Sequence, residues 1–166
     1  MSKIRQRPIE ADYINTAPGE ETASYALMGT GFTSLDENPA AQTRSRRYIN
    51  QASSTTSISG YAWTAAYNAD QIPSQAAISF IKNISVRELT GEDAETDFVK
   101  VDLDQGITNE DNTFHARRRK VAVEVASHPN NDGELGISGN LLAVSDWEEG
   151  KFNTSTKAFT KTEASS

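Results

Sequence analysis

Few side chains in this sequence could act as a nucleophile, a base or a metal ligand. Its 166 residues include no cysteine, which excludes disulfides, thiol catalysis and thiolate metal sites. The two histidines, His115 and His128, have no arrangement of serine and carboxylate nearby that would indicate a catalytic triad. We therefore expect no catalytic residue, no cofactor and no enzyme activity.

Carboxylates are the next candidates, because they bind calcium. Two acidic segments stand out, residues 89–97 and residues 109–112. Neither has the full series of ligands, ending in a bidentate glutamate, that defines an EF-hand loop. Solvated loops are the better interpretation, and we expect no metal site.

The basic residues 117–120, with the sequence RRRK, could indicate nucleic-acid binding. This run leads straight into an alternating valine strand, so its four charges are divided between two faces. No aromatic residues are interleaved with it to stack on bases. The pattern favours a solvent-facing or intersubunit cluster that pairs with the acidic loops.

The overall composition restricts the function further. The net charge is −7 and the isoelectric point is near 4.8, so the general field of the protein would repel DNA. A hydrophobic fraction of 36% and a mean hydropathy of −0.59 are low for a self-contained globule. They favour extended polar arms, or packing that is completed by other copies of the chain. With no apolar run of eighteen residues and no apolar core of a signal peptide at the start, we expect synthesis in a cytoplasm and no membrane contact.

The segment of residues 27–61 has the most informative organisation. It is predicted to form a strand at 27–35, a long polar loop at 36–55, and then a second strand. The loop has almost no apolar content but contains three arginines. Compact domains seldom keep a structureless loop of this length unless it has a function.

The remaining pattern positions these residues on a β-rich scaffold. One helix is predicted over about 73–82, where Ala77, Ile78, Ile81 and Ile84 form an apolar stripe after Pro73. Alternation predicts the strands, which cover residues 56–67, 98–104, 114–127, 135–144 and 147–159.

Side-chain alternation also assigns faces to these strands. Tyr61, Trp63 and Tyr67 share one face of the strand 56–67. In the strand 98–104, Lys100, Asp102 and Asp104 point outward, whereas the intervening apolar residues point inward.

These elements predict a mainly β fold, an antiparallel β-sandwich or barrel of two sheets with one flanking α-helix. Residues 1–23 are predicted to be an N-terminal arm, ordered mainly by contact with something else. Residues 24–160 form a single β-sandwich domain that includes the long loop 36–55. Residues 161–166 are a C-terminal tail.

Several long strings in this sequence resemble the major tail tube protein of long-tailed phages and of phage-tail-like particles of Gram-positive bacteria. They are MGTGFTSLDENPAAQTRSRRYIN, SSTTSISGYAWTAAYNADQI, ARRRKVAVEVASHPNNDGELGISGNLLAVSD and EGKFNTSTKAF, and they extend over nearly the whole chain. The resemblance implies a β-sandwich subunit, six copies of which form a ring around a channel, with rings stacked into a tube. A long loop and terminal arms would reach into neighbouring subunits.

The resemblance also suggests roles for particular residues. Arg44, Arg46, Arg47 and Tyr48 become candidates for inter-ring or intersubunit contacts, in which the arginines meet carboxylates of an adjacent ring. Asp102 and Asp104 become candidates for an acidic lumen. The implied partners are other copies of the chain, the tape measure and tail terminator proteins, and in some tails a sheath. DNA would pass through the channel without specific binding, and the protein would belong to the virion tail after assembly in the bacterial cytoplasm.

Two other function classes remain open at this point. One is a β-sandwich binding module, such as a capsid decoration or receptor-binding domain. The other is a small hydrolase, which is disfavoured because no pair of nucleophile and base can be named. The sequence does not distinguish a contractile tail from a flexible one, or a phage from a tailocin without DNA.

Overall fold

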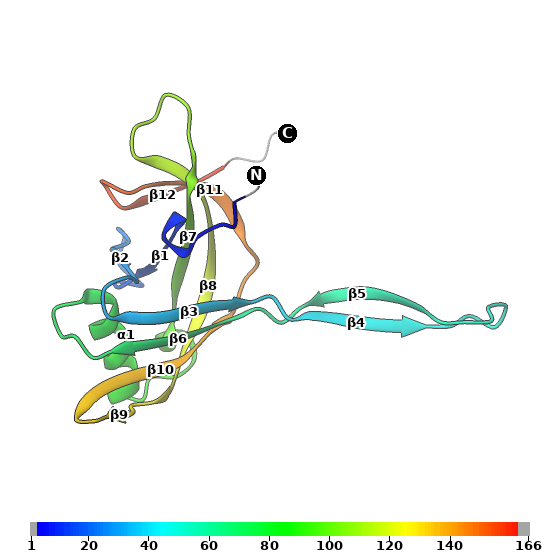
Figure 1. Ribbon diagram of the computed structural model, residues 1–166, viewed down its shortest axis with the longest axis horizontal. Helices are drawn as coiled ribbons and strands as arrows, with labels where there is room; N and C mark the ends of the chain where they lie inside the picture. Colours follow the sequence, from blue (N-terminus) through cyan, green and yellow to red (C-terminus); the bar gives the residue numbers. More distant parts are fainter. Residues whose placement is uncertain (1–2, 163–166) are drawn as a thin grey trace.

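The computed structural model describes residues 3–162, and strands dominate that range (Figure 1). The single α-helix within it is α1 (Ala76–Val86), and there are two short 3-10 helices, η1 (Arg7–Ile9) and η2 (Gly91–Ala94). The strands are β1 (Glu10–Asn15), β2 (Tyr25–Leu27), β3 (Phe32–Asn38), β4 (Ala41–Arg46), β5 (Thr55–Tyr61), β6 (Thr64–Asp70), β7 (Glu95–Gly106), β8 (Thr113–Ser127), β9 (Asn130–Asn131), β10 (Glu134–Ala143), β11 (Glu148–Asn153) and β12 (Ala158–Lys161).

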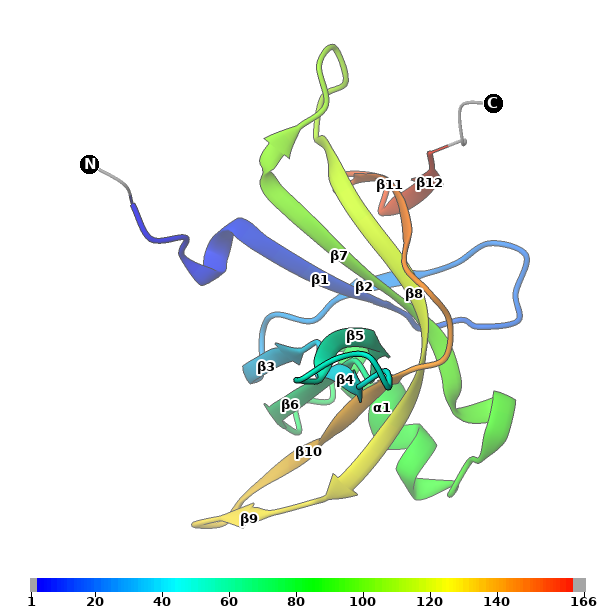
Figure 2. The ribbon, with the colours of Figure 1, turned by 90° about the vertical axis from the view of Figure 1, so that its right-hand side faces the viewer.

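All pairings are antiparallel, and the main sheet has the order β2-β1-β7-β8-β10-β6-β3. The long strand β8 lies at its centre. One edge of β8 pairs with β7, and its other edge pairs first with β11 and then with β10. The sheet is strongly curved, so that β1 and β7, on one side of β8, face β3 and β6, on its other side, across the core (Figure 2). The predicted fold class, mainly antiparallel β with one flanking helix, is confirmed.

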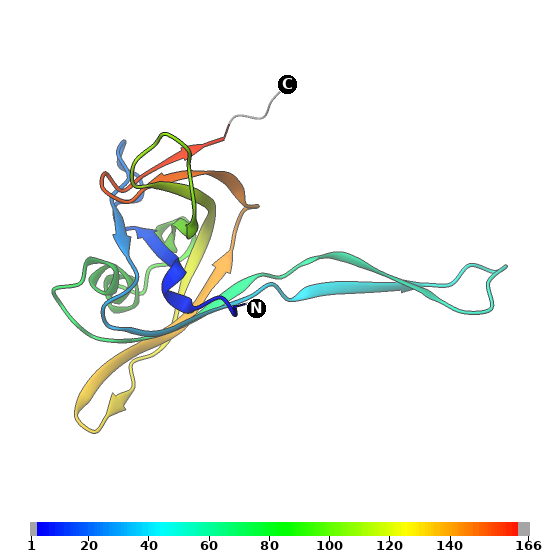
Figure 3. The ribbon, with the colours of Figure 1, turned by 45° about the horizontal axis from the view of Figure 1, so that its top comes forward.

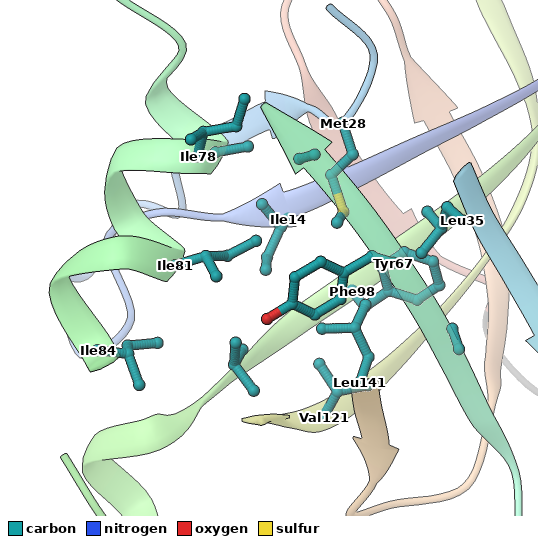
Figure 4. Packing of buried hydrophobic residues seen from close by; sticks show 14 of the residues in the cluster. Ile14, Met28, Leu35, Tyr67, Ile78, Ile81, Ile84, Phe98, Val121 and Leu141 are labelled. Atoms are coloured by element: carbon teal, nitrogen blue, oxygen red, sulfur yellow. The ribbon is translucent and has the colours of Figure 1, made fainter. Parts of the chain in front are cut away.

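The curved sheet and α1 enclose the main hydrophobic core. The predicted apolar stripe of Ala77, Ile78, Ile81 and Ile84 is buried. In Figure 4 the isoleucines of α1 point toward side chains of the surrounding strands. The helix begins at Ala76 instead of residue 73, because residues 72–75 form a turn in which the Gln75 amide donates to the Ile72 carbonyl. It continues to Val86, beyond the predicted end.

A second, smaller core lies on the other face of β1, β7 and β8. Tyr13, Val99, Val101 and Phe152 pack there, and the rings of Tyr13 and Phe152 are 4.4 Å apart. The strand β1 contributes to both cores, because Tyr13 and its neighbour Ile14 point to opposite faces.

This position of β1 corrects the predicted N-terminal arm. Residues 10–15 form a strand between β2 and β7, and Asp12 and Asn15 in it are buried. The Asn15 side chain accepts bonds from the backbone amides of Ala17 and Ser24, each at 3.0 Å. Buried polar residues of this kind interrupt the apolar alternation by which a pattern search recognises a strand. Of the predicted C-terminal tail, residues 163–166 lie outside the described range.

Three predicted strands are also corrected. The strand 27–35 is broken at Gly31, whose φ of +92° gives a turn, and a Cβ there would meet the Ile78 side chain at 2.6 Å. The strand 56–67 is broken before Trp63, so Tyr61 is exposed while Trp63 and Tyr67 are buried. The segment 147–159 forms two strands, β11 and β12, instead of one.

Candidate assembly surface

The loop predicted at 36–55 is a hairpin instead. Strands β4 and β5 pair only with each other and project far from the domain, as Figures 1 and 3 show. We call residues 39–62 the projecting hairpin. Every residue from 41 to 59 in it is exposed. The strand β5 contains threonine, isoleucine and tyrosine, residue types that are enriched in strands.

The predicted contact residues lie together on this hairpin. Arg44 pairs across the ladder with Ser57 and Arg46 with Thr55, so both arginines lie on one face. They line a shallow hollow there together with Tyr48. Near the tip, Tyr48 is 56% exposed and Ile49 is fully exposed. Arg47 is exposed as well, at the end of β4.

The root of the hairpin is fixed to the domain by buried aromatic residues. Trp63 is 4% exposed, and its indole Nε1 donates to Glu37 Oε1 at 2.7 Å. Its ring meets Trp147 edge to face, with centroids 5.3 Å apart. The guanidinium of Arg119 lies within 5 Å of both tryptophan rings. Neither Glu37 nor Trp147 was predicted at this position, because no short-range pattern links residues so far apart.

A buried lysine lies beside this root. Lys100 was predicted to point outward, but it is 5% exposed. Its Nζ lies 3.3 Å from both Glu10 and Asp12 and 3.6 Å from Glu37. Burial lowers the pKa of Lys100, but the three carboxylates together outweigh that effect and raise it. Lys100 is therefore charged at neutral pH, and the prediction failed because the compensating carboxylates come from β1 and β3.

The two proposed lumen residues lie on the outer part of β7, close to the chain start. Arg5 Nη2 donates to Asp102 at 3.2 Å and to Asp104 at 3.3 Å, and Arg5 Nη1 donates to Glu10 at 3.3 Å. The hydrogen bond to Asp102 raises the pKa of Arg5, as do the nearby charges of Asp104 and Glu10. One guanidinium thus partly neutralises both aspartates, and they lie apart from the contact candidates on the projecting hairpin.

The basic run 117–120 pairs with acidic residues of the same chain, one of which, Glu95, belongs to the acidic segment 89–97, but the run is not the predicted solvent-facing cluster, because Arg119 is buried. Arg118 donates to Glu148 at 2.7 Å, and Lys120 lies 3.7 Å from Glu95. Arg117 and Arg119 stack on Trp147. These cations are therefore engaged within the subunit.

One histidine does meet a serine. His128 Nε2 lies 2.9 Å from Ser85 Oγ, and His128 Nδ1 lies 3.3 Å from the amide nitrogen of Gln71. An amide nitrogen can only donate, so Nδ1 is the acceptor and Nε2 carries the hydrogen. The Ser85 hydroxyl in turn donates to the Lys82 carbonyl at 2.8 Å. These proton positions are opposite to those that activate a serine nucleophile.

Comparisons with known proteins give no identity. No protein-family model matches the chain, and no curated protein matches it either. Within residues 3–162 no helix is long and apolar enough to cross a membrane. In the same range, histidine and carboxylate side chains do not gather in threes that could hold a metal ion.

Proposed function

We propose that this protein is the structural subunit of a phage-type tail tube, belonging to a phage, a prophage or a tailocin. Copies of the chain would form hexameric rings that stack into a tube. The observation that carries the proposal is the projecting hairpin, in which every residue from 41 to 59 is exposed.

The physical argument concerns the stability of such an arm. A two-stranded hairpin alone in water is marginally stable at best. This one has two unpaired edges and exposed apolar side chains, Tyr48, Ile49 and Ile58, which favour association. A neighbouring subunit would cover both. A chain with one protruding arm also suits head-to-tail association, which continues from copy to copy instead of closing as a dimer.

The charge of the subunit agrees with this role. A net charge of −7 in each copy would allow DNA to slide through a channel without adhering. Asp102 and Asp104 remain candidates for the channel wall, although Arg5 reduces their charge. The tape measure and terminator proteins, and in some tails a sheath, would be further partners. The tube would assemble in the bacterial cytoplasm and remain in the virion tail.

Electron microscopy of the purified protein at high concentration tests the proposal. Stacked rings, or tubes with a central hole, are the expected result. A persistent monomer or trimer would contradict it and would favour a binding module such as a capsid decoration or receptor-binding domain.

A further inference from the structure

The domain carries an acidic surface, whereas the projecting hairpin is basic. A groove of about 640 Å³ lies between the loop 16–24 and the segment formed by η2 and the start of β7. We call it the acidic groove. Six carboxylates line it, those of Glu20, Glu21, Glu92, Asp93, Glu95 and Asp97.

Most of these carboxylates lack a cationic partner. Two cations also line the groove, Arg118 and Lys120. Arg118 is bonded to Glu148 at 2.7 Å, outside the groove, and Lys120 lies 3.7 Å from Glu95. Within residues 3–162 no lysine or arginine forms an ion pair with any of the other five. The groove therefore carries an uncompensated negative charge.

A buried hydroxyl at the groove points to a ligand as well. Tyr25 lines it and is only 5% exposed, and among the described residues no group accepts a hydrogen bond from its hydroxyl. Burial raises the pKa of Tyr25, and the nearby charge of Asp97 raises it further. A hydrogen bond from Arg118, and its charge, lower the pKa of Tyr25 in part, but a guanidinium only donates, so the phenolic hydrogen still lacks an acceptor. Leaving such a donor unpaired is unfavourable, because it has lost its bond to water without gaining another.

The arrangement does not suit a metal ion. The acidic residues are spread along the groove and do not converge in threes on a point within the described chain. A metal ion also offers no acceptor to the Tyr25 hydroxyl. A ligand that satisfies both needs would be extended, would present several spaced cations, and would carry hydrogen-bond acceptors.

The projecting hairpin has these properties. Arg44, Arg46 and Arg47 are the only charged residues between positions 38 and 69, so the hairpin carries +3. Arg44 and Arg46 lie on one face of β4, roughly 7 Å apart along the strand. The free edge of β4 exposes backbone carbonyls, which supply hydrogen-bond acceptors along an extended segment.

We propose that the acidic groove receives the projecting hairpin of a second copy of this chain, its arginines lying against the groove carboxylates. The partner is another copy because each hairpin extends away from its own domain (Figure 1). This inference rests on the proposed self-assembly and names the surfaces that make it.

Charge reversal tests the pairing directly. The hairpin variant carries Arg44→Glu, Arg46→Glu and Arg47→Glu, and the groove variant carries Glu20→Lys, Glu21→Lys and Glu92→Lys. All six positions are exposed, so both variants should fold. Each variant alone now has like charges on both surfaces. We expect the protein concentration needed for assembly to rise at least about tenfold for either one, measured by sedimentation velocity and electron microscopy.

A mixture of the two variants gives the decisive result. In a 1:1 mixture, each hairpin meets a groove of opposite charge, so assembly should return, and it should also return when all six changes are placed in one chain. A control variant with the same charge change elsewhere, Asp111→Lys with Asp132→Lys and Glu134→Lys, should assemble like the unaltered protein.

The outcomes separate this inference from the proposed function. If the unaltered protein assembles and the groove variant assembles equally well, or if the mixture fails to assemble, the groove is not the receptor and the tube proposal survives. If the unaltered protein does not assemble at all, both proposals fail.

Discussion

The projecting hairpin and the domain differ although the same two segments of the chain run antiparallel through both. β3 and β6 pair up to Asn38 and Thr64, and β4 and β5 resume pairing at Ala41 and Tyr61. On the domain side, burial alternates along β6, where Ala65, Tyr67 and Ala69 are buried between more exposed neighbours. Beyond the root, every residue from 41 to 59 is exposed. The same antiparallel pairing is thus backed by a core in one region and by no core in the other.

Trp63, at the root of the hairpin, marks the boundary between the domain and the projecting hairpin. Trp63→Ala should lower the free energy of unfolding by about 3–5 kcal/mol, because it removes a buried ring that contacts Phe98, Trp147 and Arg119. Tyr61→Ala, two residues away on the exposed hairpin, should change it by less than about 0.5 kcal/mol. Chemical denaturation measures both. Equal losses would mean that the domain does not end at Trp63.

The buried lysine provides the next test of the domain. Lys100→Met should cost about 3 kcal/mol in unfolding free energy, because Asp12 stays buried with one cation fewer. Lys151→Met is the matched control, since that lysine makes an exposed pair on β11 and its loss should cost at most about 1 kcal/mol. A cost of Lys100→Met no larger than that of the control would contradict a buried charge network.

Alkaline pH should lower the free energy of unfolding of the domain by less than these substitutions do, and gradually. The pKa values of Lys100 and of the buried Tyr67 are both raised by the fold, the latter mainly by burial. A group whose pKa is raised by folding stabilises the folded protein fully at any pH below its pKa in the unfolded chain. This contribution disappears as the pH rises through its pKa in the folded protein. The unfolding free energy should therefore hold through neutral pH and fall above about pH 10, where both groups begin to titrate in the unfolded chain. A decline in chemical-denaturation measurements already between about pH 7 and 9 would contradict these assignments.

The hairpin arginines should have the smallest effect on stability and a large one on assembly. Replacing Arg44, Arg46 and Arg47 by alanine should leave the thermal unfolding of the monomer nearly unchanged, because none of them packs on the domain. Stacking of subunits should be impaired, as judged by electron microscopy. A collapse of monomer stability would place the hairpin in the core.

The sequence predicted the parts of the fold that depend on local periodicity. The stripe from Ala77 to Ile84 and the valines of β8 repeat at helical and strand spacing, and the stripe, Val121 and Val123 are buried. Lys100 and β1 were misjudged for one common reason. Asp12 and Lys100 are buried polar residues that pair with each other although they lie 88 positions apart in the sequence, and no local pattern records such a pair.

The candidate surfaces could likewise be predicted only where a local pattern in the sequence was sufficient. Low apolar content and three arginines predicted a long polar loop over residues 36–55; residues 41–55 are exposed, but the segment contains strands that the prediction missed. The acidic groove could not be predicted, because pairing of β1 with β7 brings the loop 16–24 to η2. Its members lie far apart in the sequence, and a local pattern records only separate acidic segments.

Removal of the hairpin tests the central claim most directly. Residues 42–60 can be replaced by Asn-Gly, a two-residue turn that joins the paired residues Ala41 and Tyr61. Sedimentation velocity should then show a monomer at concentrations where the unaltered protein forms rings or tubes, while the thermal unfolding of the domain stays the same. Assembly of the shortened chain at the same concentration as the full chain would contradict the account.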